Sequence, residues 1–225
     1  EVLPVLSTSM PSLLLFDLDN TLYPESSGMD RDITRRMIEY VAAYLGMGVE
    51  EARAFRHERA KKYGTTLEWL TVEHGFSDPE SYFAAVHPEG EEYCIAPAPG
   101  LGPLLDSMPQ RKAVLTNSPS EHAERILRKL GVADRFEAVY DIRFNGLKGK
   151  PWPEAYRRAC SASGFSVEAT LFVDDMPKYV RGFLELGGRA VLVDEGGRSG
   201  GEGLVSVRSL AQLPDFPETA GRADM

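Results

Sequence analysis

The stretch that decides the fold is LLLFDLDNTLYP, Leu13 to Pro24, in which a short apolar run ends in two aspartates separated by one residue. The block Leu13 to Phe16 predicts a strand buried on both faces, because a continuous apolar run suits the centre of a parallel sheet. Ligands of open α/β sheets bind at the carboxyl ends of the strands, so Asp17 and Asp19 would stand at the mouth of a crevice. A polar turn that caps the next element is the alternative, since Asp and Asn are favoured there too.

Later apolar blocks rich in β-branched residues predict further strands. They lie at Lys112 to Thr116, Ala138 to Asp141, Thr170 to Asp174, Arg189 to Val193 and Leu204 to Val207. Segments with apolar residues at helical intervals separate them, at His122 to Leu130, Glu154 to Ser163 and Tyr179 to Leu186. Alternating strands and helices imply right-handed crossovers, so the sequence predicts an α/β fold with a doubly wound parallel sheet.

One long segment, from about Asp30 to Tyr93, breaks this alternation because it shows helical periodicity and no strand candidate. The stretches DITRRMIEYVAAYLG and VEEARAFRHERAKKYG predict amphipathic helices that stop at Gly46 and Gly64. The proline-rich segment APAPG then leads back to the sheet. We therefore expect an α/β core domain formed by residues 1–22 and 97–225, with an inserted α-helical cap domain at 23–96.

Composition sets limits on the class of protein. The 225 residues are 43% hydrophobic and 26% charged, with a net charge of −9, which are ordinary globular values with an acidic excess. That excess of negative charge disfavours binding to a nucleic acid polymer or to an anionic membrane. For the oligomeric state we expect a monomer or homodimer. Cys94 and Cys160 cannot form a disulfide framework, which suits a cytoplasmic location. The histidines show no paired spacing typical of zinc ligands: His57, His74, His87 and His122.

Polar groups that phosphate chemistry needs follow the later strands. The strand KAVLT ends in Thr116 and Asn117, which offer a hydroxyl, an amide and backbone N–H groups beside a helix N-terminus. Lys150, directly before a proline in LKGKPWPEAY, offers an ammonium to a phosphate oxygen. The strand TLFVDD ends in Asp174 and Asp175, adjacent acids suited to Mg²⁺. Each group alone fits a helix cap or a solvated charge, but their joint placement at successive strand ends favours phosphate chemistry.

The segments FDLDNTLYP, LTNS, GKP and FVDD together resemble the four signature motifs of the haloacid dehalogenase-like superfamily. Within it, DLDNTLYP, KKYGTTL in the insertion and YDI ahead of GKP resemble the pyrimidine 5'-nucleotidase-like branch. The resemblance implies a Rossmann-like core with a helical cap inserted after the first strand. It also implies a Mg²⁺-dependent phosphatase whose partner is a small phosphate ester, such as a nucleoside monophosphate.

The resemblance also implies residue roles. Asp17 would be the nucleophile that forms an aspartyl phosphate, and Asp19 would be the general acid and base, so the two acids need different pKa values. Thr116 and Lys150 would hold the phosphate, together with Asn117. The metal ligands would be Asp17, Asp174 and the backbone carbonyl of Asp19, with Asp175 supporting the site from outside the ligand set.

Substrate choice is expected in the cap, since the sheet domain would recognise only the phosphate. Candidates for contact with a base or sugar are Tyr63, Thr65, Thr66 and Trp69, at a spacing that core packing also explains. After YGTTL, where this branch would carry a basic residue, the sequence has Glu68 and Trp69.

Two other functions share parts of this pattern. A phosphomutase acting on a sugar phosphate has every core motif and differs only in the group that accepts the phosphoryl. A phospho-accepting signalling or interaction module also combines acids, Thr and Lys on a parallel sheet. It would carry its acid pair first and would lack the long helical insertion.

Overall fold

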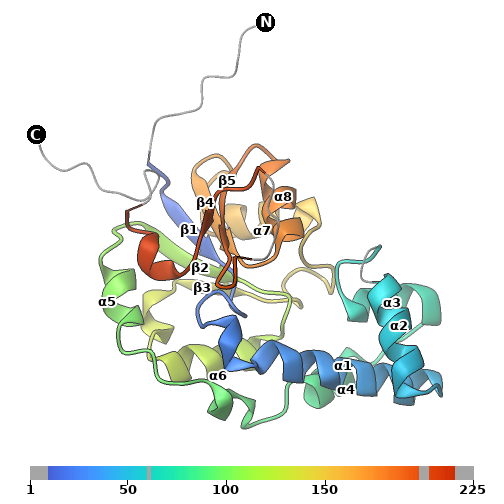
Figure 1. Ribbon diagram of the computed structural model, residues 1–225. Coiled ribbons are helices and arrows are strands. Elements are labelled where there is room, and N and C mark those ends of the chain that lie inside the picture. Colours follow the sequence, from blue (N-terminus) through green and yellow to red (C-terminus); the bar gives the residue numbers. More distant parts are fainter. Residues whose placement is uncertain (1–9, 60–61, 198–202, 216–225) are drawn as a thin grey trace, which may run out of the picture.

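The centre of the molecule is a parallel six-stranded sheet in the computed structural model, which describes residues 10–59, 62–197 and 203–215 (Figure 1). The strands are β1 (Leu13–Phe16), β2 (Arg111–Leu115), β3 (Ala138–Tyr140), β4 (Thr170–Asp174), β5 (Arg189–Val193) and β6 (Ser206–Val207). Their order is β3-β2-β1-β4-β5-β6, and every neighbouring pair is parallel. The predicted doubly wound sheet is confirmed, although the last strand is shorter than the expected Leu204 to Val207.

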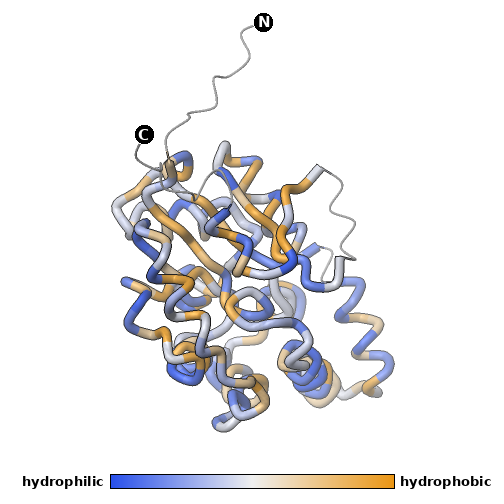
Figure 2. Tube along the Cα trace, turned by 60° about the vertical axis from the view of Figure 1, so that its left-hand side comes forward, coloured by the Kyte–Doolittle hydropathy of each residue, from blue (hydrophilic) through white to orange (hydrophobic). Residues whose placement is uncertain are grey.

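Helices cover both faces of the sheet, and the alternation of side chains along β1 shows why its apolar run is continuous. Leu14 and Phe16 belong to one buried cluster with residues of α5 (Leu101–Asp106) and α6 (Ser120–Leu130). Leu13 and Leu15 belong to a second cluster with α7 (Pro153–Ala162) and α8 (Pro177–Leu184). Figure 2 shows these hydrophobic strands running through the middle of the molecule. Because β1 lies where the strand order reverses, its carboxyl end faces the crevice in which such sheets bind ligands.

The helices of the core begin slightly earlier than periodicity alone predicts. Helix α7 begins at Pro153 and α8 at Pro177, where a proline in the first turn costs no hydrogen bond. Helix α6 begins at Ser120, after the extended Pro119. Two short 3₁₀ helices complete the core, at Ala133–Arg135 and Leu210–Gln212.

Four helices between β1 and α5 form the cap, which lies to one side of the sheet in Figure 1. They are α1 (Met29–Leu45), α2 (Val49–Arg59), α3 (Thr66–His74) and α4 (Pro79–Val86), with 3₁₀ turns at Glu25–Ser27 and Glu91–Cys94. Helix α1 ends at Gly46, as predicted, because that glycine adopts the left-handed conformation (φ 66°).

The expectation that Gly64 stops the second helix is wrong. Helix α2 is described only to Arg59, and Gly64 lies in the turn before α3, against the backbone of the core. A Cβ atom at this position would lie 2.8 Å from the backbone oxygen of Lys150. A residue without a side chain is therefore needed at position 64, because the cap and the core approach each other closely there. Within the described ranges, none of the helices is both long enough and apolar enough to cross a membrane.

Candidate active site

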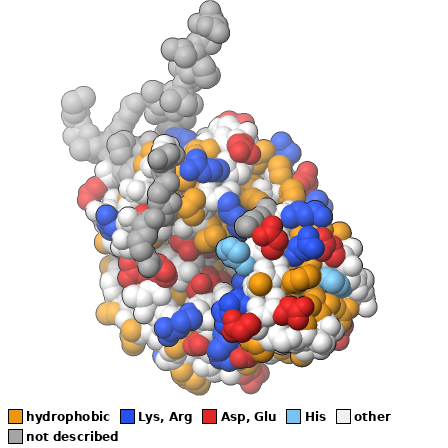
Figure 3. Space-filling model, turned by 45° about the vertical axis from the view of Figure 1, so that its right-hand side comes forward, with side chains coloured by type: hydrophobic (Ala, Val, Ile, Leu, Met, Phe, Trp, Pro, Cys, Tyr) orange, Lys and Arg blue, Asp and Glu red, His pale blue; other side chains and the backbone are white. Residues whose placement is uncertain are grey.

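A cavity of about 350 Å³ lies between the carboxyl ends of the central strands and the cap. Asp17 and Asp19 after β1, Thr116 after β2, and Asp175 after β4 line its core side. Cap residues from α1, α2, α3 and α4 line the opposite side. Figure 3 shows a hollow with acidic and basic side chains gathered around it. The structure thus brings together the polar side chains that the sequence placed at separate strand ends.

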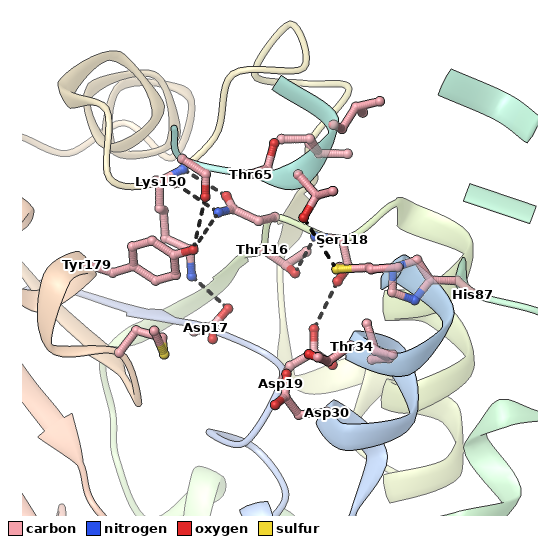
Figure 4. A pocket seen from close by; sticks show the side chains of 18 of the residues that line it. Asp17, Asp19, Asp30, Thr34, Thr65, His87, Thr116, Ser118, Lys150 and Tyr179 are labelled. Atoms are coloured by element: carbon pink, nitrogen blue, oxygen red, sulfur yellow. Dashed lines mark hydrogen bonds and ion pairs between the residues drawn. The ribbon is translucent and has the colours of Figure 1, made fainter. Parts of the chain in front are cut away.

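A buried ion pair network joins three of the predicted residues, Lys150, Asp17 and Asp174, and Figure 4 shows the pair formed by Lys150 and Asp17. The Nζ atom of Lys150, which is 1% exposed, lies 2.7 Å from Oδ1 of Asp17 and 2.6 Å from Oδ2 of Asp174. Although burial acts to lower it, the charges of the two aspartates raise the pKa of Lys150, so the ammonium stays charged. Burial raises the pKa of Asp17 to about 8, against the effect of Lys150. One lysine therefore neutralises only part of the negative charge that gathers here.

The carboxylates of Asp17, Asp174 and Asp175 form a cluster in which one oxygen atom from each residue lies within 4.8 Å of the other two. Burial and the charges of Asp174 and Asp17 raise the pKa of Asp175 to about 9. Three crowded carboxylates beside one ammonium are a donor set that fits a hard divalent cation, because such ions prefer oxygen ligands and would offset the excess negative charge.

Asp19 has surroundings quite different from those of Asp17. Its Oδ1 atom accepts a hydrogen bond from the hydroxyl of Tyr23 (2.6 Å) and lies 2.7 Å from Nε2 of His122. Its Oδ2 atom accepts a hydrogen bond from the hydroxyl of Ser118 (2.9 Å). Burial favours the neutral acid, but the charge and hydrogen bond of His122 outweigh it and hold the pKa of Asp19 well below its usual range. The two acids therefore have pKa values shifted in opposite directions.

Asn117 lines the cavity, but its side-chain amide is hydrogen-bonded within the protein. Its Oδ1 atom accepts from the backbone N–H of Lys150 (2.8 Å), and its Nδ2 donates to the backbone oxygen of Lys150 (2.9 Å). A Cβ on residue 149 would lie 2.0 Å from this Oδ1, so a glycine is needed beside these two hydrogen bonds. Nδ2 also donates to the Tyr179 hydroxyl (3.3 Å), so both of its hydrogens are engaged and Asn117 fixes the loop that carries Lys150. Phosphate binding by Asn117 therefore stays a prediction for its backbone N–H. Thr116 is buried in the cavity wall, as expected.

The four cap candidates divide into two pairs. Thr65 and Thr66 line the cavity, and the Thr66 hydroxyl accepts a hydrogen bond from Nε of Arg56 (2.9 Å). Tyr63 and Trp69 do not line it, so the expected substrate contact is wrong for both. Trp69 is 1% exposed, and its indole N–H and the Tyr63 hydroxyl both donate to Glu73. These two aromatic residues pack inside the cap, because the same helical spacing serves core positions.

Further polar contacts hold the cap against the core. The Oε2 atom of Glu68 accepts from the backbone N–H of Gly64 (2.8 Å) and from the indole of Trp152 (2.8 Å). The Tyr179 hydroxyl donates to the backbone oxygen of Gly64 (3.4 Å). Glu68, which stands where a basic residue was expected, therefore has a role in this junction.

A buried group formed by His87, Glu91 and His122 was not predicted from the sequence. Their ligand atoms lie close enough for a metal, but the Glu91 carboxylate already accepts hydrogen bonds from Arg36 (2.7 Å) and Arg125 (2.8 Å). Two guanidinium groups on the same carboxylate oppose a cation there. Sequence spacing could not reveal this group, because its members come from the end of the cap and from α6.

Comparisons with known proteins agree with this geometry. The family model for haloacid dehalogenase-like hydrolases matches residues 11–187. "Phosphate metabolism protein 8" of Saccharomyces cerevisiae is 26% identical over 190 residues, which are 78% of this chain and 59% of that protein. "Phosphatase MT3486" of Mycobacterium tuberculosis is 33% identical over 127 residues, which are 55% of this chain and 57% of that protein. The matches thus span less than two thirds of these curated relatives.

Solved structures share the fold at lower identity. The L-2-haloacid dehalogenase of Xanthobacter autotrophicus with covalently bound chloropropionic acid aligns with a TM-score of 0.59 and 19% identity, over 94% of this chain and 100% of that one. An HAD phosphatase of Thermococcus onnurineus aligns with a TM-score of 0.61 and 18% identity, over 91% of this chain and 96% of that one. At such identities, these likenesses show the fold alone.

Proposed function

The chain belongs to the haloacid dehalogenase-like hydrolase family, and we propose that it is a Mg²⁺-dependent phosphomonoester hydrolase that acts through an aspartyl phosphate. The observation that carries this proposal is the convergence of Asp17, Asp174, Asp175 and Lys150 in one buried cluster beside a cavity. Curated relatives named for phosphate metabolism and as a phosphatase support the same reaction class.

Charge balance supports the metal. Asp17 and Asp174 are the side chains placed to hold the ion, and Asp175, which accepts from the amide of Asn20 (3.3 Å), stands beside them. When bound, a divalent cation would neutralise part of the charge of the phosphoryl group and of these carboxylates. Its charge would also keep Asp17 ionised, against the burial that raises the pKa of this acid.

The reaction then divides between the two aspartates. A carboxylate oxygen of Asp17 attacks phosphorus, and the bond from phosphorus to the ester oxygen breaks as the new bond forms. In the free protein Asp19 is ionised, but the negative charge of an ester bound beside it in the cavity would oppose that form, so Asp19 takes up a proton as the ester binds. Asp19 then delivers this proton to the departing alkoxide, which leaves as an alcohol. In the second step Asp19 takes a proton from water, whose oxygen attacks phosphorus and frees Asp17. Thr116 and Lys150 hold the phosphoryl oxygens through both steps.

Recognition of the leaving group falls to the cap side of the cavity. Thr65, Thr66 and Arg56 line it together with the partly apolar Met37 and Tyr82. This mixture of hydroxyl, guanidinium and aromatic groups fits a small polar ester, and we place a nucleoside monophosphate first among candidates.

Two rival reactions use the same core. A phosphomutase would return the phosphoryl group to a sugar, and the cavity of about 350 Å³ could admit one. A dehalogenase would not need a proton donor at Asp19, whereas this structure surrounds Asp19 with three hydrogen-bonding side chains. That observation favours phosphate transfer.

A panel of esters tests the proposal: UMP, CMP, AMP, sugar phosphates, phosphoglycolate and pyridoxal phosphate, each assayed for inorganic phosphate with Mg²⁺. We expect release from at least one alkyl ester by the wild type, and none by Asp17→Asn. The control is Asp134→Asn, an exposed aspartate remote from the cavity. Isomerised ester without free phosphate would indicate a mutase, and no turnover of any ester would overturn the proposal.

A further inference from the structure

The three hydrogen-bonding neighbours of Asp19 use its two oxygens unequally. An ionised carboxylate oxygen offers about two acceptor sites. Both sites of Oδ1 are engaged, by Tyr23 and His122, whereas Oδ2 has Ser118 as its single partner among the described residues. The acceptor site that remains on Asp19 is therefore on Oδ2. Figure 4 shows Ser118 and Asp19 facing each other at the cavity.

The imidazole of His122 contacts a second carboxylate through the ring nitrogen that does not face Asp19. It is 0% exposed on α6, and its Nδ1 atom lies 2.5 Å from Oε1 of Glu91. Because each ring nitrogen faces a carboxylate, which only accepts, both nitrogens donate and the ring has a single orientation.

Glu91 is itself fixed from two domains. Its side chain is fully buried and accepts hydrogen bonds from Arg36 on cap helix α1 (2.7 Å) and from Arg125 on core helix α6 (2.8 Å). A carboxylate buried in this way keeps one geometry, because losing a partner would leave a charge uncompensated. The chain from Glu91 through His122 to Asp19 is thus a continuous rigid connection.

We propose that His122, oriented by Glu91, is a positioning residue that occupies Oδ1 of Asp19 and so makes Oδ2 the atom that exchanges the proton with leaving group and water. The inference rests on the proposed phosphatase function. Neither His122 nor Glu91 lines the cavity, so they act through Asp19 and do not touch substrate. A catalytic acid held in one orientation avoids the losses that follow from small displacements of reacting groups.

The test compares two esters of similar size that differ in their need for a proton. p-Nitrophenyl phosphate has a leaving group that departs unprotonated, whereas benzyl phosphate releases an alkoxide. The ratio kcat/KM covers only the steps through leaving-group departure, so water attack does not mask the difference. Since general acid catalysis contributes about 10²- to 10⁴-fold, we expect His122→Asn to lower kcat/KM for benzyl phosphate by about 10- to 100-fold and for p-nitrophenyl phosphate by less than about 3-fold.

Two further variants separate positioning from folding. In His122→Gln the amide nitrogen reaches the place of Nε2, so it should recover much of the benzyl phosphate activity that Asn, with a shorter side chain, loses. Glu91→Gln keeps an acceptor oxygen but removes the negative charge that faces Nδ1 of His122, so it should show the same selective loss in weaker form. Tyr140→Phe is the control, because it removes a buried hydrogen bond to Ser163 (2.8 Å) outside this network. Circular dichroism establishes that each variant is folded.

The outcomes are separable. Selective loss in His122→Asn and Glu91→Gln, with recovery in His122→Gln, supports the inference. Equal losses on the two esters, or none, in folded variants would overturn it while wild-type turnover still upholds the phosphatase. If the wild type hydrolyses neither ester with Mg²⁺, the proposed function fails and the inference fails with it.

Discussion

Replacing Gly64 with alanine should separate cap from core without touching a catalytic side chain. The new Cβ would lie 2.8 Å from the backbone oxygen of Lys150 and 3.0 Å from Nε1 of Trp152, where ordinary contact begins near 3.4 Å. The cap turn must therefore move back by about 0.6 Å at a point where the opposing atom is rigid backbone. Gly64 is not among the positive-φ residues, so the effect is steric. Forcing an extra methyl into a packed junction costs about 1–3 kcal/mol, which corresponds to about 5- to 150-fold in the population of the closed form.

The assay is kcat/KM for the best alkyl ester of the panel, measured beside the melting temperature. We expect kcat/KM to fall by about 5- to 150-fold, with an unfolding transition close to that of the wild type, because an open cap remains folded. Gly48→Ala is the matched control, since its Cβ meets nothing within 4 Å and its φ is not positive either. If both alanine variants keep wild-type kcat/KM, the contact at Gly64 has no part in the working closed state, and the reasoning is refuted.

Three further predictions follow from the site. Removal of divalent metal with EDTA should abolish turnover and Mg²⁺ should restore it, because Lys150 alone cannot offset three carboxylates; full activity in metal-free buffer would contradict this. Rapid quenching followed by intact-mass measurement should find a phosphoenzyme in the wild type but not in Asp17→Asn, and a phosphorylated variant would exclude Asp17 as nucleophile. The last concerns Glu91, whose pKa is lowered to about 2, since the hydrogen bonds and charges of His122 and His87 outweigh burial. An acid whose pKa is lowered by folding stabilises the fold above its unfolded pKa, here 4.5, and this contribution is lost as the pH falls towards 2. The free energy of unfolding of the wild type should therefore exceed that of Glu91→Gln by about 2–3 kcal/mol less at pH 2 than at pH 4.5. Parallel stability curves for the two proteins in urea titrations would show that this pKa is not depressed.

Much of the core was predictable from local sequence patterns, because residues that follow parallel strands lie close together at one edge of the sheet. The apolar run before Asp17 has the composition of a central parallel strand, and parallel strands bring their carboxyl ends to one edge. The acids after β1 and β4 therefore meet in space although about 155 residues separate them, as the hydrogen bond between Asn20 and Asp175 shows. No long-range information beyond strand order was needed for this step.

The rest of the site was not predictable from such patterns, because it depends on which side chains meet after the cap has folded. Helical spacing places Trp69 equally well in a cap core or at a cavity, and only packing decides for the core. Likewise, the sequence alone does not show what the side-chain amide of Asn117 contacts. In the folded chain this amide is hydrogen-bonded to the backbone of Lys150. Glu91 belongs to a 3₁₀ turn at the end of the cap and to none of the motifs, and it is connected to Asp19 through His122 on another element.

Asp17 and Asp19 belong to one short motif, but the structure gives them different partners, and the two roles proposed for them depend on those partners. Their positions, two residues apart, aim both carboxylates at one cavity, yet local sequence cannot make their pKa values differ. The difference comes from partners elsewhere in the chain: burial beside the carboxylate of Asp174 raises the pKa of Asp17, whereas His122 lowers that of Asp19. The proposed roles therefore depend on what binds: a cation beside Asp17 and Asp174 would favour the ionised nucleophile, whereas the charge of a bound ester would favour the proton on Asp19.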